Sequence, residues 1–230
     1  MALVENLYND KDSLNTQFAA KIAEQLNAAI AKNGKATFAV SGGSTPKPLF
    51  QILSQNADVD WANVTVMLVD ERWVDDSSEA SNQTLVKQNL LQNEASKANY
   101  LSIKTTADSA ESAIAEIDKK VKAQLPLDVV ILGMGGDGHT ASLFPCSKEL
   151  EEGLRLDKVE SVIATQPTTA PHQRMSLTLA SIVSASNVYL HITSDAKKMV
   201  LDEALAKHTA LEKPIKAVAD NTDLLLMWAP

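Results

Sequence analysis

The chain has 230 residues, of which 45% are hydrophobic and 22% are charged, a composition typical of a globular protein with a substantial core. The net charge of −8 and the pI near 5 argue against nucleic acid or an anionic membrane as the main partner. They do not exclude a small anionic substrate, because a local cluster of cations can bind one.

Apolar residues recur every four positions in the first predicted helix, over residues 13–33, which Gly34 would end. A buried strand is predicted at 36–40, followed by the turn SGGSTP and a second helix with Thr45 as N-cap and Pro46 in its first turn. Further helices are predicted at 81–91, 107–124 and 195–208. Further strands are predicted at 64–69, 127–132, 161–165, 187–192 and 224–228.

Alternating apolar strands and helices predict an α/β fold with a single open, mostly parallel sheet and helices on both faces. We see no repeat or long linker, so residues 1–230 are interpreted as one domain. Ligands of such folds bind beyond the carboxyl ends of the strands. The loops after Val40, Val69 and Leu132 should therefore converge on one site.

The loop after residue 132, GMGGDGH, matches the dinucleotide fingerprint G-x-G-x-x-G. That fingerprint requires a long helix next and then a strand that ends in an acid. Pro145 limits any following helix to about two turns, and the next strand ends in Gln166, so we reject the dinucleotide interpretation. The loop instead favours His139 as a general base or acid, with Gly135 and Gly136 bringing backbone close to a ligand.

The turn SGGSTP predicts an anion site. Its backbone N–H groups, its hydroxyls and the positive end of the following helix favour a phosphate. It lacks the Gly-Lys-[Ser/Thr] of a nucleotide P-loop. The residues assigned to phosphate here are Ser41, Gly42, Gly43, Ser44 and Thr45.

DERWV follows the strand at 64–69 as a polar loop in which at most two of Asp70, Glu71 and Arg72 can face one site. Its place at the end of a strand favours Asp70 and Arg72. Arg174 and Lys197 are predicted to lie in loops from which they could bind phosphate.

Other kinds of site have little support. His172, His191 and His208 show no ligand spacing, so no metal site is predicted. The serines form no G-x-S-x-G elbow, and Cys146 is interpreted as a packed residue rather than a nucleophile. A single cysteine, an N-terminus without a signal peptide and no long apolar run predict a cytoplasmic protein.

In this order, SGGSTP, VDERWV, GMGGDGHTASLFP, RMSLTL and the Lys197 segment resemble the 6-phosphogluconolactonases over essentially the whole chain. The resemblance implies hydrolysis of the lactone of 6-phosphogluconate in the pentose phosphate pathway, without a cofactor. It also implies a Rossmann-like fold shared with glucosamine-6-phosphate deaminases and ribose-5-phosphate isomerases. Its partner would be a phosphorylated sugar lactone, with no nucleic acid, membrane or obligate protein partner.

The sequence departs from this family at one site segment. The family often has T-G-x-x-K where this chain has Thr193-Ser194-Asp195-Ala196-Lys197, so Ser194 stands at the position of the glycine.

Two other functions remain as alternatives. In deaminases the histidine is followed by a segment like I-A-F-N-E-P, whose glutamate helps to open the sugar ring. In this chain Phe144 stands near the position of that glutamate. Deaminases also carry an aromatic residue near the position of Arg72. A non-catalytic sugar-phosphate sensor would need an attached DNA-binding segment, and no basic helix-turn-helix precedes residue 13.

For lactone hydrolysis we expect His139 to take the proton of water, with Asp70 or Asp137 orienting its ring. Glycine-loop N–H groups or Arg72 would stabilise the oxyanion. SGGSTP, Arg174 and Lys197 would hold the phosphate. The sequence does not decide which acid orients the histidine, or whether Arg72 serves phosphate or oxyanion.

Overall fold

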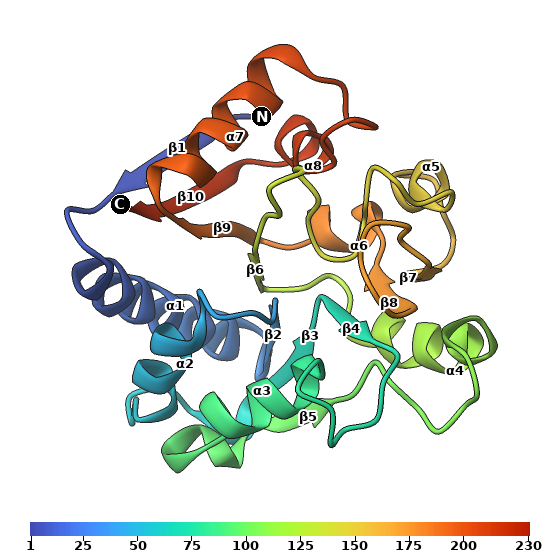
Figure 1. Cartoon of the computed structure of the whole chain (residues 1–230). Helices are drawn as coiled ribbons and strands as arrows, with labels where there is room; N and C mark the ends of the chain where they lie inside the picture. The colour runs from blue at the N-terminus through green and yellow to red at the C-terminus, as the bar shows by residue number, and fades with distance from the viewer.

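The computed structural model describes residues 1–230, and its main feature is a parallel sheet of seven strands (Figure 1). The order across the sheet is β1-β10-β9-β6-β2-β3-β5. These strands are β1 (Leu3–Leu7), β2 (Ala36–Val40), β3 (Val64–Leu68), β5 (Asn99–Leu101), β6 (Val129–Leu132), β9 (Asn187–Thr193) and β10 (Leu224–Ala229). All neighbouring pairs are parallel, which confirms the predicted α/β class.

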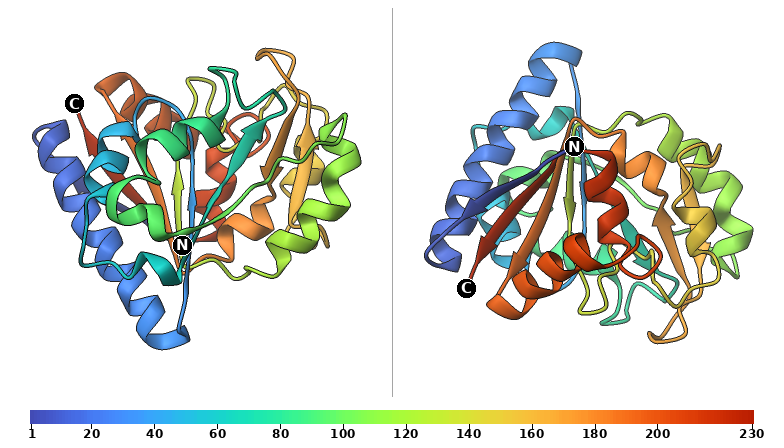
Figure 2. Two further views of the ribbon diagram at one scale, coloured as in Figure 1. Left: turned by 90° about the horizontal axis from the view of Figure 1, so that it is seen from below. Right: turned by 90° about the horizontal axis from the view of Figure 1, so that it is seen from above.

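Helices cover both faces of this sheet. They are α1 (Lys11–Asn33), α2 (Lys47–Ser54), α3 (Asn82–Asn89), α4 (Ala110–Lys122), α5 (Leu150–Gly153), α6 (Leu179–Val183), α7 (Asp195–Lys207) and α8 (Ile215–Asn221), with short 3₁₀ turns at Trp61–Asn63 and Asn93–Lys97. α1, α2 and α3 lie on one side, and α7 and α8 lie on the other (Figures 1 and 2). None of the helices combines the length and the apolar character needed to cross a bilayer.

The first helix shows why the sequence folds in this way. Leu14, Phe18, Ile22 and Leu26 are completely buried, as their four-residue spacing predicts, and α1 packs on the sheet through them. Asp10 caps its start by accepting from the backbone of Ser13. Gly34 ends it with φ +76°, the left-handed conformation that favours glycine.

A second, smaller sheet was not predicted. It is antiparallel, has the order β4-β8-β7, and lies beside α4 and α5 (Figure 1). Its strands are β4 (Asp70–Arg72), β7 (Val162–Thr165) and β8 (Arg174–Leu177). The strand predicted at 161–165 therefore exists, but it belongs to this sheet and not to the parallel one.

Two loop predictions are wrong for the same physical reason. Asp70–Arg72 forms β4 and Arg174 lies on β8, where a loop was predicted for each, because the two polar segments pair with one another through their backbones. Backbone pairing leaves no clear hydrophobic pattern when a segment is this short. Lys197 was also assigned to a loop, and it lies instead in the first turn of α7, within the helix predicted at 195–208.

Two helix starts also differ from prediction. α2 begins at Lys47, and Pro46 holds the N-cap position without a side-chain cap, so Thr45 lies one residue further out. α4 begins at Ala110, because the Ser109 hydroxyl caps it in a capping box with Ser112.

The chain changes direction across the sheet between β2 and β6. From β2 it proceeds to β3 and β5 on one side, and from β6 to β9 and β10 on the other. In open α/β sheets such a point leaves a crevice at the carboxyl ends of the strands. Here Ser41 follows β2 and Gly133 follows β6, and the Gly133 N–H donates to Ser41 Oγ at 3.1 Å. The predicted convergence of these loops is confirmed.

Candidate active site

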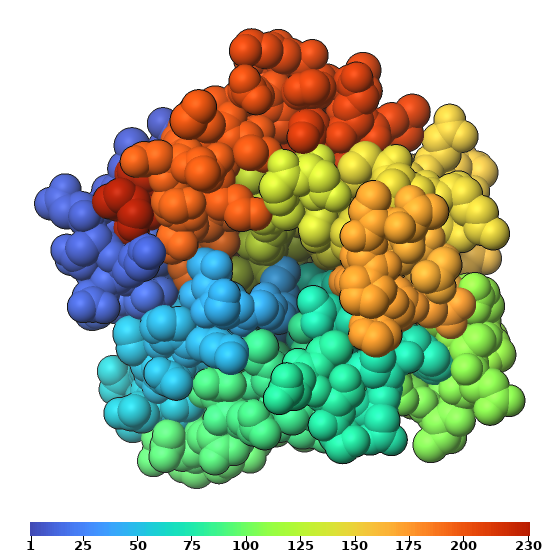
Figure 3. All heavy atoms as spheres, in the orientation of Figure 1, coloured from blue at the N-terminus to red at the C-terminus, as the bar shows by residue number.

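A cavity of about 430 Å³ lies at this crevice, and Figure 3 shows the molecular surface hollowed there. Of the predicted site residues, eleven line it: Ser41, Gly42, Gly43, Ser44, Thr45, Asp70, Arg72, Gly135, His139, Arg174 and Lys197. Asp137 and Gly136 do not line it. The sequence interpretation did not include several other lining residues, among them Asn82, Met134, Ala141, His191, Thr193 and Ser194.

The glycines after β6 form a tight turn that presents His139. The Gly135 N–H donates to the His139 carbonyl at 2.9 Å, and Gly138, with φ +83°, donates to the Gly135 carbonyl at 3.1 Å. A Cβ atom at Gly135 would overlap the His139 ring. The glycine is therefore required to leave room for the imidazole, and its N–H is not free for a ligand.

His139 is held by the neighbouring carboxylate. Its Nδ1 lies 2.6 Å from Asp137 Oδ1, and its backbone N–H donates to the same oxygen at 3.1 Å. Burial raises the pKa of Asp137, but the hydrogen bonds and charge of His139 outweigh burial and bring that pKa to about 2. We assign the Nδ1 proton to this contact, which leaves Nε2 as the ring nitrogen that can accept a proton.

An aromatic ring covers one side of the histidine. Phe144 stacks on His139 with ring centroids 3.9 Å apart and planes 23° apart. The guanidinium of Arg174 lies 5.0 Å from the centroid of the same phenylalanine ring. No carboxylate stands in the position of Phe144, where a ring-opening deaminase would need one.

Asp70 is the other candidate for orienting the histidine, and it contacts different groups. Its Oδ2 accepts from the buried Ser142 hydroxyl at 2.6 Å and lies 3.9 Å from Arg174 Nη1. Of the two carboxylates, Asp137 is the one that contacts His139, and Asp70 is the partner of an arginine.

Glu71 points away from the cavity and fixes the segment that carries its neighbours. It is fully buried and accepts from the backbone N–H groups of Arg72, Asn82 and Gln83 at 2.7, 2.9 and 2.6 Å. Burial raises its pKa above the usual range, although these hydrogen bonds oppose the shift. Asp70 and Arg72 face the site, so two of the three charged residues do, as predicted.

Two arginines lie side by side on the small sheet, because Arg72 on β4 is the register partner of Arg174 on β8. Each donates one hydrogen bond to a backbone carbonyl. Arg72 donates to Ala80 at 2.7 Å, and Arg174 donates to Pro171 at 3.3 Å. The Nε atoms of both are buried and have no partner. Burial lowers the pKa of Arg174, and Asp70 opposes that shift. Two adjacent guanidinium groups that line a cavity are suited to an anion.

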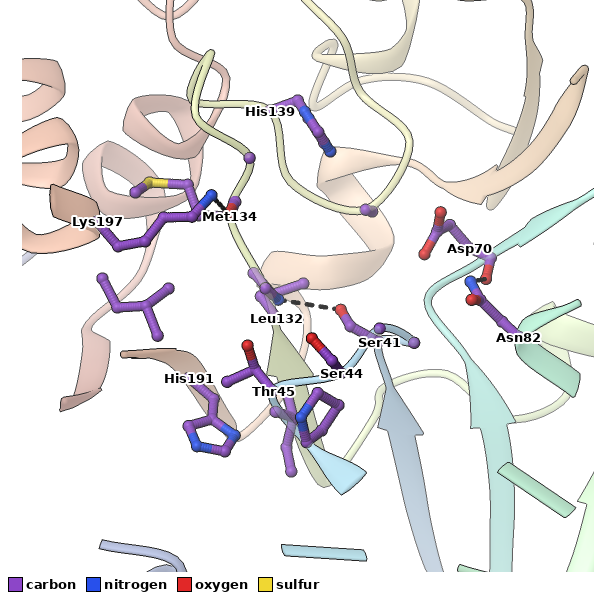
Figure 4. Close-up of a pocket in the computed structure, with 18 of the residues that line it drawn as sticks. Ser41, Ser44, Thr45, Asp70, Asn82, Leu132, Met134, His139, His191 and Lys197 are labelled. Atoms are coloured by element: carbon purple, nitrogen blue, oxygen red, sulfur yellow. Dashed lines mark hydrogen bonds between the residues drawn. The ribbon is translucent and has the colours of Figure 1, made fainter. Parts of the chain in front are cut away.

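The turn after β2 offers a second set of donors. The backbone N–H groups of Gly42, Gly43, Ser44 and Thr45 donate to no protein group, and Gly43 adopts φ +96°. Lys197 extends from α7 across the cavity and donates to the Met134 carbonyl at 2.8 Å (Figure 4). Consecutive free amides and a nearby ammonium are the features expected of a phosphate site.

Ser194, which precedes the lysine segment, has a backbone conformation that suits glycine. Its φ is +81° and its ψ is 148°, and its carbonyl accepts from Trp228 Nε1 at 3.0 Å. Such a conformation costs a residue with a Cβ about 1–3 kcal/mol. Ser194 therefore stands in place of the glycine of T-G-x-x-K, while its backbone keeps a conformation that favours glycine.

Ser194→Gly is expected to raise the free energy of unfolding by about 1 kcal/mol, because relief of strain exceeds the extra chain entropy of glycine. Urea denaturation would measure this. The control is Ser184→Gly at the C-cap of α6, where φ is −69° and glycine should lower stability. A loss of stability in Ser194→Gly as large as in the control would contradict the strain.

His191 on β9 is a buried histidine without a hydrogen-bond partner. It is 3% exposed, neither ring nitrogen contacts a polar protein group, and Phe18 meets it edge to face at 5.4 Å. Burial lowers its pKa to about 4. Since the folded state resists protonation, His191 is neutral at pH 7, and it contributes to the floor of the cavity rather than to proton transfer.

His191→Leu is expected to raise the free energy of unfolding by about 1–3 kcal/mol at pH 7, since it removes buried polar atoms that are unpaired. In the wild type only the unfolded chain takes up this proton between pH 6.5 and about 4, so stability falls as pH falls through that window. The loss amounts to ~3 kcal/mol. Denaturation curves at pH 7 and 4.5 should show a weaker pH dependence in the variant, and an unchanged dependence would contradict this role.

Comparison with known proteins shows the family to which the chain belongs. Residues 9–228 match the family model described as glucosamine-6-phosphate isomerases/6-phosphogluconolactonase. The chain belongs to this family. It is 40% identical to the 6-phosphogluconolactonase of Rhizobium meliloti strain 1021, with 98% of each chain covered, and 38% identical to that of Pseudomonas putida, with 96% and 90% covered. The crystal structure of a 6-phosphogluconolactonase from Shewanella baltica superimposes with a TM-score of 0.92 at 40% identity, covering 99% and 98% of the two chains.

Asn82 is a residue of the cavity that the sequence could have indicated. It lies directly after Ser81, the first residue of the helix predicted at 81–91, and Ser81 caps α3 by accepting from the Thr84 N–H at 3.2 Å. Its position in the sequence was the available signal. Asn82 lies in the first turn of the helix that follows DERWV, and that turn lies at the same edge of the sheet as DERWV.

Proposed function

We infer that this chain is a 6-phosphogluconolactonase, which hydrolyses 6-phospho-D-glucono-1,5-lactone to 6-phospho-D-gluconate in the oxidative pentose phosphate pathway. The observation that carries the inference is His139, backed by Asp137 and stacked on Phe144, in a cavity that also holds two arginines. The names of the relatives support the same substrate. We also propose that the protein works in the cytoplasm, where a single cysteine suits the reducing conditions.

Hydrolysis begins with a water molecule between His139 Nε2 and the lactone carbonyl carbon. The neutral imidazole takes a proton from this water as the oxygen attacks, and Asp137 stabilises the imidazolium that results. The electron pair of the carbonyl moves to its oxygen, which becomes an oxyanion. When the intermediate collapses, the bond from the carbonyl carbon to the ring oxygen breaks, and His139 returns the proton to that leaving oxygen.

In this proposal, one set of donors binds the phosphate of the substrate and another stabilises the oxyanion. The SGGST turn, Lys197 and Arg174 hold the phosphate, which fixes the lactone carbonyl beside His139. Arg72, which lines the cavity, stabilises the oxyanion. The glycine loop contributes less than the sequence suggests, since the N–H groups of Gly133 and Gly135 have partners within the protein.

Arg72→Ala is therefore expected to lower kcat by roughly 10²–10³-fold, the usual effect of removing one oxyanion donor, with a smaller change in KM. Steady-state kinetics with the phosphorylated lactone would measure both constants. If the loss falls mainly on KM, Arg72 binds the phosphate instead.

One experiment separates lactone hydrolysis from the deaminase alternative. The same preparation is assayed for 6-phosphogluconate formed from the lactone, after subtraction of spontaneous hydrolysis, and for ammonia released from glucosamine 6-phosphate. We expect rapid lactone hydrolysis and no ammonia. Ammonia release with a lactone rate equal to the background would overturn the proposal.

A further inference from the structure

The side-chain amide of Asn82 has a fixed orientation at the edge of the cavity. Asn82 begins α3 and is 3% exposed, and its backbone N–H donates to the buried Glu71 carboxylate at 2.9 Å. Its Nδ2 donates to the backbone carbonyl of Asp70 at 3.0 Å (Figure 4). Because a carbonyl can only accept, the nitrogen must face Asp70, and the orientation of Oδ1 follows from it.

That oxygen lies against the phosphate-binding turn. A Cβ atom at Gly42 would overlap Asn82 Oδ1, so the glycine leaves the space that the amide oxygen occupies. No protein group donates to Oδ1, and Asn82 and Gly42 both line the cavity. The site therefore contains one oriented acceptor among a set of donors.

An acceptor here selects among the groups of the substrate. The phosphate, the lactone carbonyl and the ring oxygen are themselves acceptors, so Oδ1 repels them. The sugar hydroxyls are the only donors that the proposed substrate carries. A buried acceptor that remains unpaired lowers the affinity for a ligand that lacks the matching donor.

We propose that Asn82 is a specificity-determining residue whose Oδ1 accepts a hydrogen bond from a ring hydroxyl of the sugar lactone. This inference rests on the proposed function, since it concerns the same cavity and substrate. Asn82 then distinguishes hydroxylated sugar lactones from deoxygenated ones, and it excludes the phosphate from the part of the cavity beside Asp70.

The test combines substrate and protein changes. kcat/KM is measured for the phosphorylated lactone and its 2-deoxy, 3-deoxy and 4-deoxy analogues, with the wild type, with Asn82→Ala and with Gln83→Ala. Gln83 is the control, because it is the next residue of α3 and its side chain donates to Asp76 at 2.6 Å rather than lining the cavity.

We expect the wild type to lose roughly 10- to 100-fold in kcat/KM on one of the three deoxy lactones. Asn82→Ala should lose a similar factor on the parent lactone and should discriminate against that analogue by less than about threefold. Gln83→Ala should keep the discrimination of the wild type.

Two results would overturn the inference while the proposed function stands. One is a wild-type kcat/KM that differs by no more than about twofold among the four lactones, a result that does not depend on whether any variant folds. The other is an Asn82→Ala variant that is slower on all four by one factor, which would make Asn82 a support for Asp70 only. Failure of the wild type to hydrolyse the parent lactone would instead refute the proposed function.

Discussion

Replacing His139 by asparagine should lower kcat for the phosphorylated lactone by roughly 10²–10⁴-fold, the range for loss of one general base. Asparagine keeps a polar side chain of similar size in the turn, but it cannot accept a proton at neutral pH. KM should change little, because the groups assigned to the phosphate lie on other segments: the turn after β2, β8 and α7.

The control for this variant is His208→Asn at the end of α7, which removes a histidine that contacts Glu212 and lies outside the cavity. It should retain the wild-type kcat. A folded His139→Asn protein with kcat near that of the wild type would show that His139 is a residue of the turn and nothing more.

Arg174→Ala should raise KM for the phosphorylated lactone by roughly 10- to 100-fold, because it removes charge-assisted hydrogen bonds of about 1.5–3 kcal/mol each. The unphosphorylated lactone should be affected little. Measuring both substrates is essential, since Asp70 loses its cationic neighbour in this variant and any general damage would appear on both.

Arg155→Ala is the matched control, because that arginine is exposed and pairs with Glu152 and Asp157 on the surface. It should leave both substrates unchanged. Equal losses on the two lactones in Arg174→Ala would exclude Arg174 from the phosphate site.

The parallel sheet was predictable because its central strands are apolar and continuous. β2, β3, β6 and β9 were identified from their buried runs, and α1 from its four-residue spacing. Their order along the chain also predicts where the loops meet. His139 and the SGGST turn could be placed at the cavity from position alone, since both follow central strands.

The small sheet was not predictable in the same way. β4 is three residues long and has the sequence Asp-Glu-Arg, which does not alternate, and β8 has only four residues, too few for its alternation to identify a strand. Their pairing joins residues about a hundred positions apart, and this pairing brings Arg72 beside Arg174. β1 was missed because it is an exposed edge strand, and β5 because it is only three residues long.

The contacts of individual side chains in the site could not be predicted from the sequence. Asp70 and Asp137 were equal candidates for orienting His139, and the turn of the glycine loop decided between them, since it folds Asp137 back on the ring two residues later. The orientation of Asn82 likewise follows from the Asp70 carbonyl, which no pattern of residue types reveals.

The pH dependence of kcat tests the central claim, a neutral His139 that takes a proton from water, most directly. The pKa of Asp137 is about 2, so its carboxylate stays ionised from pH 5 to 8, and a loss of activity in that range cannot come from it. A protonated imidazole cannot take a proton from water, so the proposed base is lost when His139 is protonated. After subtraction of spontaneous hydrolysis, wild-type kcat should fall as the pH is lowered from 8 to 5, towards a tenfold loss per pH unit. A wild-type kcat that stays constant down to pH 5 would contradict the mechanism.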